Sequence, residues 1–226
     1  MKSGVIGLVD GNGQKLESFE KTNERNDENL KACVEVLRTQ TSDHNNSTIQ
    51  FGRAAIEKPA TQDSINIVDG SISVSERTAI ETLYTEFVFV PGEFAVVSNG
   101  SGTFAFDLFT THLPGVDVDR GKIDLNPHVE SVPEGVPWQV GFYGNIGEAE
   151  KGTIYGDNVL RDEKMGDVVE SSQKNQIGLT IESGSETIKY TITESGYIEI
   201  YQPSNYEEQE FTAFIQDHVL PYAYKE

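Results

Sequence analysis

The C-terminal third of the chain alternates apolar and polar residues in three successive segments, and this pattern limits the fold more than any other feature. Side chains that alternate with a period of two lie on one face of a β-strand. Turn-forming residues separate the segments at 183–185 and 194–196. The sequence therefore predicts a three-stranded antiparallel meander. Its apolar positions are Ile177, Leu179 and Ile181, then Ile188, Tyr190 and Ile192, then Ile198 and Ile200.

An amphipathic helix is predicted to follow the meander and to cover its apolar face. Asn205 is a good N-cap, and Glu208 stands three residues later, as in a capping box. The helix would pack through apolar residues that recur at helical spacing, namely Phe211, Phe214, Ile215 and Val219. A meander covered by one helix is typical of an α+β fold.

The N-terminal half also predicts mostly strands. Residues 4–9 and 15–20 flank the turn Asp10-Gly11-Asn12-Gly13, which indicates a hairpin. Residues 48–56 and 64–74 read as strands, and the second contains a possible Asp69-Gly70 hairpin turn. Further strands are predicted at 87–90, 93–97, 103–109, 138–143 and 152–160, and Trp138 and Phe142 of the fourth are expected in the core.

Three further helices are suggested by the pattern. Leu30, Cys33, Val34 and Leu37 are spaced as one helical face between Asn26 and Gln40, so Cys33 is expected to be buried. A short helix over 76–85 competes with an extended strand leading into Phe87. Residues 162–171 predict another short helix.

These elements predict a single α+β domain in which two or three amphipathic helices pack on antiparallel β-meanders. Two packed halves, 1–109 and 138–226, are an alternative arrangement of the same elements. The segment 110–137 has little periodicity and four prolines, so it is expected to be an irregular connection. No run of apolar residues is long enough to predict a membrane-spanning helix.

The charge of the chain is strongly negative. Its 37 acidic and 17 basic residues give a formal net charge of -20, and no Lys or Arg occurs between Tyr190 and Tyr224. This distribution disfavours a phosphate-binding surface there and favours a protein partner with a basic surface. Adaptation to high salt and a plain solvated surface are the alternatives. A lone cysteine and the lack of a signal peptide predict a cytoplasmic protein.

The sequence has no strong catalytic signature. The glycine-bearing segments 98–102 and 141–147 match neither a phosphate loop nor a dinucleotide fingerprint, so no cofactor is expected. The best enzyme hypothesis is a metal-assisted hydrolase built in the central loop. Its candidate ligands are His112, Asp117, Asp119, Asp124 and His128, although their spacing matches no known metal loop.

The partner-binding residues predicted from the sequence lie near the C-terminus. Tyr197, Glu199 and Tyr201 alternate with Ile198 and Ile200, so they should share the face of the strand that points away from the core. Glu207 and Glu210 follow in the acidic span. Tyrosines are favoured in protein interfaces. They could also stack on nucleobases, so a nucleic-acid-binding protein from a salt-adapted organism is a further alternative.

Overall fold

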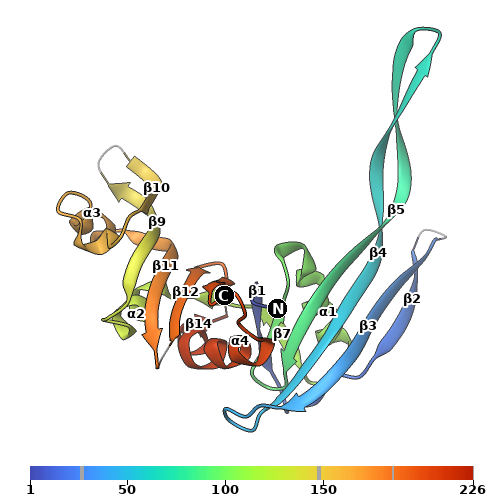
Figure 1. Ribbon diagram of the computed structural model, residues 1–226. Coiled ribbons are helices and arrows are strands. Elements are labelled where there is room, and N and C mark those ends of the chain that lie inside the picture. The colour runs from blue at the N-terminus through green and yellow to red at the C-terminus, as the bar shows by residue number, and fades with distance from the viewer. Residues whose placement is uncertain (26–27, 147–148, 185, 226) are drawn as a thin grey trace.

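The computed structural model describes residues 1–25, 28–146, 149–184 and 186–225. Within this part of the chain, twelve strands form one curved antiparallel sheet (Figure 1). The strand order is β10-β9-β11-β12-β13-β1-β6-β5-β4-β3-β2, and β7 also pairs with β1. The broad prediction of an antiparallel α+β fold is confirmed, but sheet dominates and the helices are short.

The N-terminal strands make up one side of the sheet. Their bounds are β1 Ser3–Asp10, β2 Phe19–Arg25, β3 Glu28–Thr41, β4 Thr48–Val68, β5 Ser71–Val90, β6 Phe94–Val97 and β7 Asp117–Arg120.

The C-terminal strands make up the other side and join it through the pairing of β13 with β1. Their bounds are β9 Val136–Ile146, β10 Ala149–Tyr155, β11 Gln173–Ser183, β12 Glu186–Thr193 and β13 Tyr197–Gln202. A separate two-stranded sheet consists of β8 Lys122–Ile123 and β14 Ala223–Tyr224.

The helices are α1 Phe104–His112, α2 Leu125–Ser131, α3 Gly166–Ser171 and α4 Glu208–Phe214. A π-helical turn, Ile215–Val219, continues α4. Short 3-10 turns occupy Gly100–Thr103, Val159–Arg161 and Leu220–Tyr222.

The two faces of the sheet carry two separate apolar cores. Ile6 of β1 points into the first core, which lies under α4 and contains Phe211 and Phe214. Its neighbour Val5 points into the second core, which lies under α1 and contains Phe106 and Phe109. The second core covers only the N-terminal side of the sheet, so the matching face of β9 to β13 has no helix on it in the described structure.

The prediction of a helix over 26–40 is wrong where the structure describes these residues, and Asn26 lies outside them. The segment forms β3, which pairs with β2 on one side and β4 on the other. Leu30, Ala32 and Val34 are buried in alternation, whereas Cys33 and Leu37 are exposed. The apolar residues thus follow a period of two, and the helical spacing arose by coincidence.

Two other assignments exchange helix and strand. Residues 76–85 belong to β5, as the extended alternative predicted. The segment predicted as a strand at 103–109 is helical from Phe104 on and forms most of α1, because Ala105, Phe106 and Phe109 bury one helical face against the second core. Asn99 starts the preceding turn, where its side chain accepts a hydrogen bond from the Gly102 amide.

The hairpin predicted between 4–9 and 15–20 does not form. β1 pairs instead with β13, β6 and β7, and the residues after Leu16 lead into β2. The segment 110–137, expected to be irregular, contains β7, β8 and α2.

The predicted C-terminal meander is confirmed as β11, β12 and β13. The following helix is also confirmed, but it begins two residues later than its predicted cap implied. Glu207 is the N-cap, and Glu210 completes the capping box. No helix in the described residues is long and apolar enough to cross a membrane.

Candidate protein-binding surfaces

Strands β4 and β5 extend far beyond the rest of the sheet as a two-stranded ribbon (Figure 1). Pairing of β4 with β3 ends at Ile56, and pairing of β5 with β6 ends at Phe87. We call residues 57–82, which pair only with each other, the arm. At about 3.3 Å per residue, twelve residue pairs would reach on the order of 40 Å.

The arm is a regular hairpin, because its strands pair without a register shift and its turn has a twist that matches theirs. Pairing runs without a shift from Gln50 opposite Phe89 to Val68 opposite Ser71. Asp69 and Gly70 close the hairpin with φ values of 51° and 79°. Positive φ at both central residues is the geometry of a type I′ turn, whose twist matches that of the strands.

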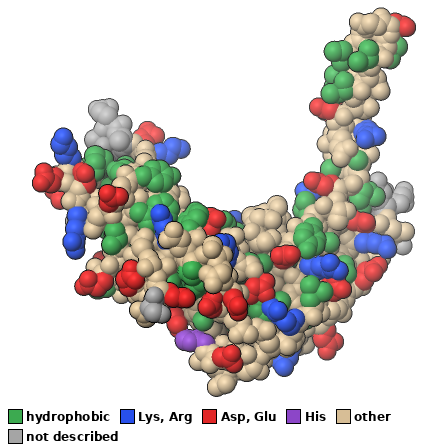
Figure 2. Space-filling view, in the orientation of Figure 1, with side chains coloured by type: hydrophobic (Ala, Val, Ile, Leu, Met, Phe, Trp, Pro, Cys, Tyr) green, Lys and Arg blue, Asp and Glu red, His purple; other side chains and the backbone are tan. Residues whose placement is uncertain are grey.

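One face of the arm is apolar and exposed at its tip. Ile65 pairs with Val74, and Ile67 pairs with Ile72, so these four side chains share a face at the tip. Their exposed fractions are 67% for Ile65, 79% for Ile67, 72% for Ile72 and 62% for Val74. Ile80 and Tyr84 are exposed further down the same face. We call these six residues the stripe, and Figure 2 shows apolar side chains gathered at the tip of the arm.

The opposite face of the arm tip is polar except for Val68, which pairs with Ser71 and is exposed. It carries Ser64 opposite Ser75, and Asn66 opposite Ser73. A strand that is apolar on one face and polar on the other normally buries its apolar face. The stripe is therefore an unpaired apolar surface, and such surfaces mark sites of protein interaction when they reach several hundred Å².

A second surface lies on the uncovered face of β9 to β13, where aromatic side chains gather. We call it the open face, and it consists of Trp138, Gln139, Tyr155, Gly178, Lys189, Thr191, Tyr197, Glu199 and Tyr201. Tyr155 and Tyr201 are exposed, at 66% and 41%. This surface is broad rather than hollow.

Trp138 forms the centre of the open face. The register of β9 against β11 shifts between Gly178 and Leu179. The Trp138 ring covers Gly178, lies 5.8 Å from the Tyr201 ring and has the Lys189 ammonium 4.5 Å from its centroid. The prediction that Trp138 and Phe142 share a core face is therefore wrong for Trp138, while Phe142 does lie in the first core.

Hydrogen bonds hold the polar groups of the open face in place. Tyr197 and Tyr201 both donate to Oε2 of Glu199, at 3.1 and 3.0 Å. Burial and the Glu199 carboxylate raise the pKa of both tyrosines, so their hydroxyls stay protonated donors. Gln139 donates to the Tyr155 hydroxyl at 3.2 Å.

The five partner-binding residues predicted from the sequence lie on two different surfaces. Tyr197, Glu199 and Tyr201 share the open face, in agreement with their alternation with buried Ile198 and Ile200. Glu207 and Glu210 stand at the start of α4, which packs on the opposite face of the sheet. Their carboxylates cap that helix, and the Glu207 amide donates to Glu210 at 2.6 Å.

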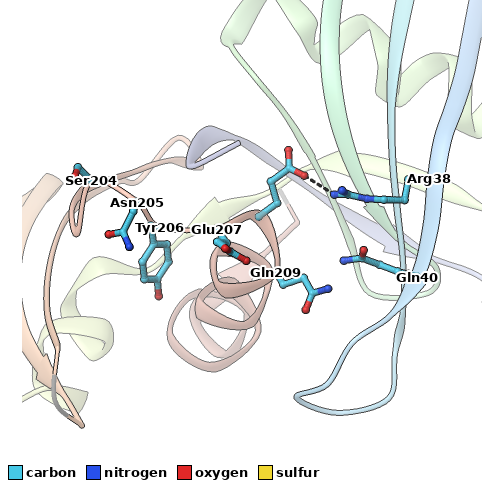
Figure 3. Close-up of a pocket in the computed structure, with 8 residues that line it drawn as sticks. Arg38, Gln40, Ser204, Asn205, Tyr206, Glu207 and Gln209 are labelled. Atoms are coloured by element: carbon cyan, nitrogen blue, oxygen red, sulfur yellow. Dashed lines mark hydrogen bonds and ion pairs between the residues drawn. The ribbon is translucent and has the colours of Figure 1, made fainter.

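The start of α4 borders a polar cleft of about 390 Å³ against β3 (Figure 3). Its only charged group from β3 among the lining residues is Arg38, which pairs with Glu208 at 2.5 Å. The amino group of Met1 contacts the same carboxylate at 2.9 Å. Burial would raise the pKa of Glu208, but these two cations lower it. The cleft's cation is thus already neutralised, and the cleft serves to tie the N-terminus, β3 and α4 together.

The candidate metal ligands of the central loop are not brought together. His112 stacks on Phe19 with ring centroids 3.7 Å apart. Asp117 and Asp119 lie near Lys225, at 3.9 and 2.8 Å, and Asp124 caps α2. Within the described ranges, no group of three or more His, Cys, Asp or Glu side chains could hold a metal ion.

His128, the remaining candidate ligand, is fully buried. Its Nε2 lies 3.1 Å from the Tyr190 hydroxyl. Burial, together with the charge of nearby His218, lowers the pKa of His128 to about 4. A neutral histidine in a closed aromatic environment is a structural group rather than an accessible ligand.

Sequence reasoning missed the arm as a candidate binding surface, although part of its signal was present. The alternation of Ile65, Ile67, Ile72 and Val74 about Asp69-Gly70 predicted a hairpin. It gave no indication that the apolar face would lie in solvent. No protein-family model matches the chain, and no curated protein matches it in sequence. A proposal for the function of the chain therefore starts from the stripe and the open face.

Proposed function

We propose that this chain is a binding protein that acts through contacts with another protein, made by the stripe of the arm and by the open face. The observation that carries the proposal is the arm, whose tip has four apolar side chains of one face open to solvent. An isolated two-stranded hairpin is at best marginally stable in water. Exposed strand edges and apolar faces are also an aggregation hazard. A persistent arm of this kind is best explained by a partner that covers it.

The chemistry of the open face supports the same function. Tyrosine and tryptophan are enriched in protein interfaces because each offers a large apolar area with a polar group at its edge. Here the hydroxyls of Tyr197 and Tyr201 are oriented by one carboxylate. The negative charge of the chain favours a partner that presents basic groups at the place of contact.

A photo-crosslinking residue placed at Ile67 would test this function in a native extract. We expect it to capture a protein, because Ile67 is the most exposed residue of the stripe. The matched control is the same residue at Ser73, which lies at the tip on the opposite face. Equal capture from both positions, or no protein captured from Ile67, would contradict the proposal.

The same experiment addresses the nucleic-acid alternative. An adduct that nuclease reduces to the mass of the chain alone would favour it. The open face offers aromatic rings for stacking and Lys189 for a phosphate, but Glu199 lies between its tyrosines. The metal-assisted hydrolase stays a prediction without a supporting observation in the described residues.

A further inference from the structure

We propose that the partner of the arm is a second copy of this chain, and that the stripe of one copy docks on the open face of the next. This inference rests on the proposed function and adds the identity of the partner. It is carried by the area of the two surfaces, by their local charges and by their placement on opposite sides of the molecule (Figure 1).

The area of the stripe is sufficient for a specific interface. The exposed fractions of the four tip residues leave on the order of 500 Å² of apolar side chain in solvent, the upper range for the largest patch on a soluble monomer. Ile80 and Tyr84, each about half exposed, add apolar area nearer the body of the molecule, beyond the polar pairs Asp63–Glu76 and Thr61–Thr78. The sum approaches the roughly 800 Å² per partner that stable interfaces bury.

The two carboxylates beside the stripe would be stabilised by a cation on the docking partner. Asp63 and Glu76 are directly opposite each other on the stripe's own face, between the tip residues and Ile80. Like charges in this position destabilise a strand pair. Two arms packed stripe to stripe would bring four such carboxylates together, so a symmetric arm-to-arm contact is disfavoured.

The open face supplies the matching groups. Trp138, Tyr155 and Tyr201 offer apolar rings for the tip, and the Lys189 ammonium lies over the Trp138 ring. Lys189 is one of the 17 basic residues of a chain with net charge -20. It lies over the Trp138 ring and forms no ion pair within the part of the chain that the structure describes. Docking of the arm would place Asp63 and Glu76 near this ammonium group.

Contact between two different surfaces implies an assembly to which further copies can be added. The arm and the open face are different surfaces of one chain, so each copy can use both at once. A contact between two unlike surfaces generates a ring when the rotation closes and a filament when it does not. Binding should therefore produce species larger than a dimer.

The test uses the purified chain alone, at a salt concentration of roughly 0.5 M so that general repulsion is screened. Light scattering after size-exclusion chromatography should show a mass that rises with protein concentration. Trp138 is the only tryptophan, so its fluorescence should change over the same concentration range.

Variants of each surface show whether that surface takes part in the assembly. Ile67→Asp with Ile72→Asp should remove the stripe contact and raise the dissociation constant at least a hundredfold. Asn66→Asp with Ser73→Asp adds the same charge to the opposite face of the same tip, and it should leave assembly intact. Tyr155→Asp with Lys189→Glu should block the open face and also give a monomer.

Mixing the two blocked variants distinguishes this contact from a symmetric one. The stripe variant keeps an intact open face, and the open-face variant keeps an intact arm. Together they should form one dimer, about twice the 24.9 kDa of the chain, that cannot grow further.

Three results would overturn the inference: a wild-type chain that stays monomeric, assembly that survives the stripe variant, or a mixture that stays monomeric. If the wild-type chain is monomeric but its Ile67 probe still captures a different protein, only the identification of the partner as a second copy would be contradicted. It would leave the proposed function in place.

Discussion

At the scale of single residues, the buried His128 makes stability depend on pH in a defined direction. Its folded-state pKa of about 4 lies below the ordinary value of 6.5, so the unfolded chain binds the proton more tightly. The contribution of His128 is therefore complete above pH 6.5 and is lost as the pH falls toward 4. Between pH 7 and pH 5 the loss should be about 2 kcal/mol.

His128→Gln would test this expectation in chemical denaturation at several pH values. Gln does not titrate, and it can still hydrogen-bond to the Tyr190 hydroxyl. The variant should lose about 2 kcal/mol less than the native chain between pH 7 and pH 5, whatever its stability at pH 7. Parallel pH profiles for the two proteins would show that His128 is not the group responsible.

Gly178 allows Trp138 to lie flat on the sheet. A Cβ at this position would stand 2.6 Å from the Trp138 ring, closer than atoms approach without a shift. We expect Gly178→Ala to displace the ring, to cost about 1–3 kcal/mol and to change the emission of Trp138. Gly100→Ala is the control, because a Cβ there meets open space. Unchanged emission in Gly178→Ala would contradict the described packing of the open face.

Residue patterns predicted part of this site and could not predict the rest. The shared face of Tyr197, Glu199 and Tyr201 follows from alternation within one strand. Trp138 and Tyr155 join them through pairings between strands far apart in sequence. A register shift also turns Trp138 away from the face that simple alternation gives it. Pairing partners and register shifts are long-range properties, and a local pattern does not contain them.

At the scale of elements, the arm should be separable from the stability of the body. None of the residues between Pro59 and Ile80 belongs to either apolar core. We expect replacement of residues 60–79 by Asn-Gly to change the free energy of unfolding by less than about 1 kcal/mol, since that pair favours a tight hairpin turn between the remaining strand ends. Thermal and chemical unfolding would measure the change.

A substitution lower in the same strand gives the contrast. Ile49 of β4 is fully buried in the first core, so Ile49→Ala should cost about 2–5 kcal/mol. If the shortened arm destabilised the protein as much as Ile49→Ala, the arm would be part of the folding unit. In that case it could not be treated as a dedicated binding element.

A strand or helix could be predicted from the sequence where its local residue pattern and its contacts in the fold favour the same structure. Asp69-Gly70 and the β11–β13 meander have turn residues and alternation that favour the observed structure. In residues 28–41 the two disagreed, because Cys33 and Leu37 completed a helical spacing by chance. The segment became a strand because β2 and β4 satisfy its backbone on both sides, and strand preference depends on such neighbours.

At the scale of the whole molecule, excess negative charge opposes the proposed assembly. A chain with net charge -20 repels its own copies at distances beyond any single contact. The arm tip is the place where this repulsion is weakest, since Asp69 is the only charged residue between Ser64 and Ser75. A tip with a single charged residue on an acidic body allows contact to be made at a distance from most of the charge.

Salt should therefore stabilise both the fold and the assembly. The Debye length falls from about 10 Å at 0.1 M to about 3 Å at 1 M, so carboxylates that repel each other across the surface are screened. We expect the unfolding temperature to rise steadily over this range of sodium chloride. Local attraction between Lys189 and the Asp63–Glu76 pair weakens under the same conditions, but burial of the apolar stripe does not.

The two effects can be separated by comparing the native chain with the shortened-arm chain in one salt series. If charge repulsion within the body dominates stability, both proteins should gain the same unfolding temperature per step of salt at low protein concentration. At high protein concentration the native chain should gain more, because assembly stabilises the folded state by mass action. Equal gains at every concentration would mean that salt acts on the fold alone and that the arm does not link copies.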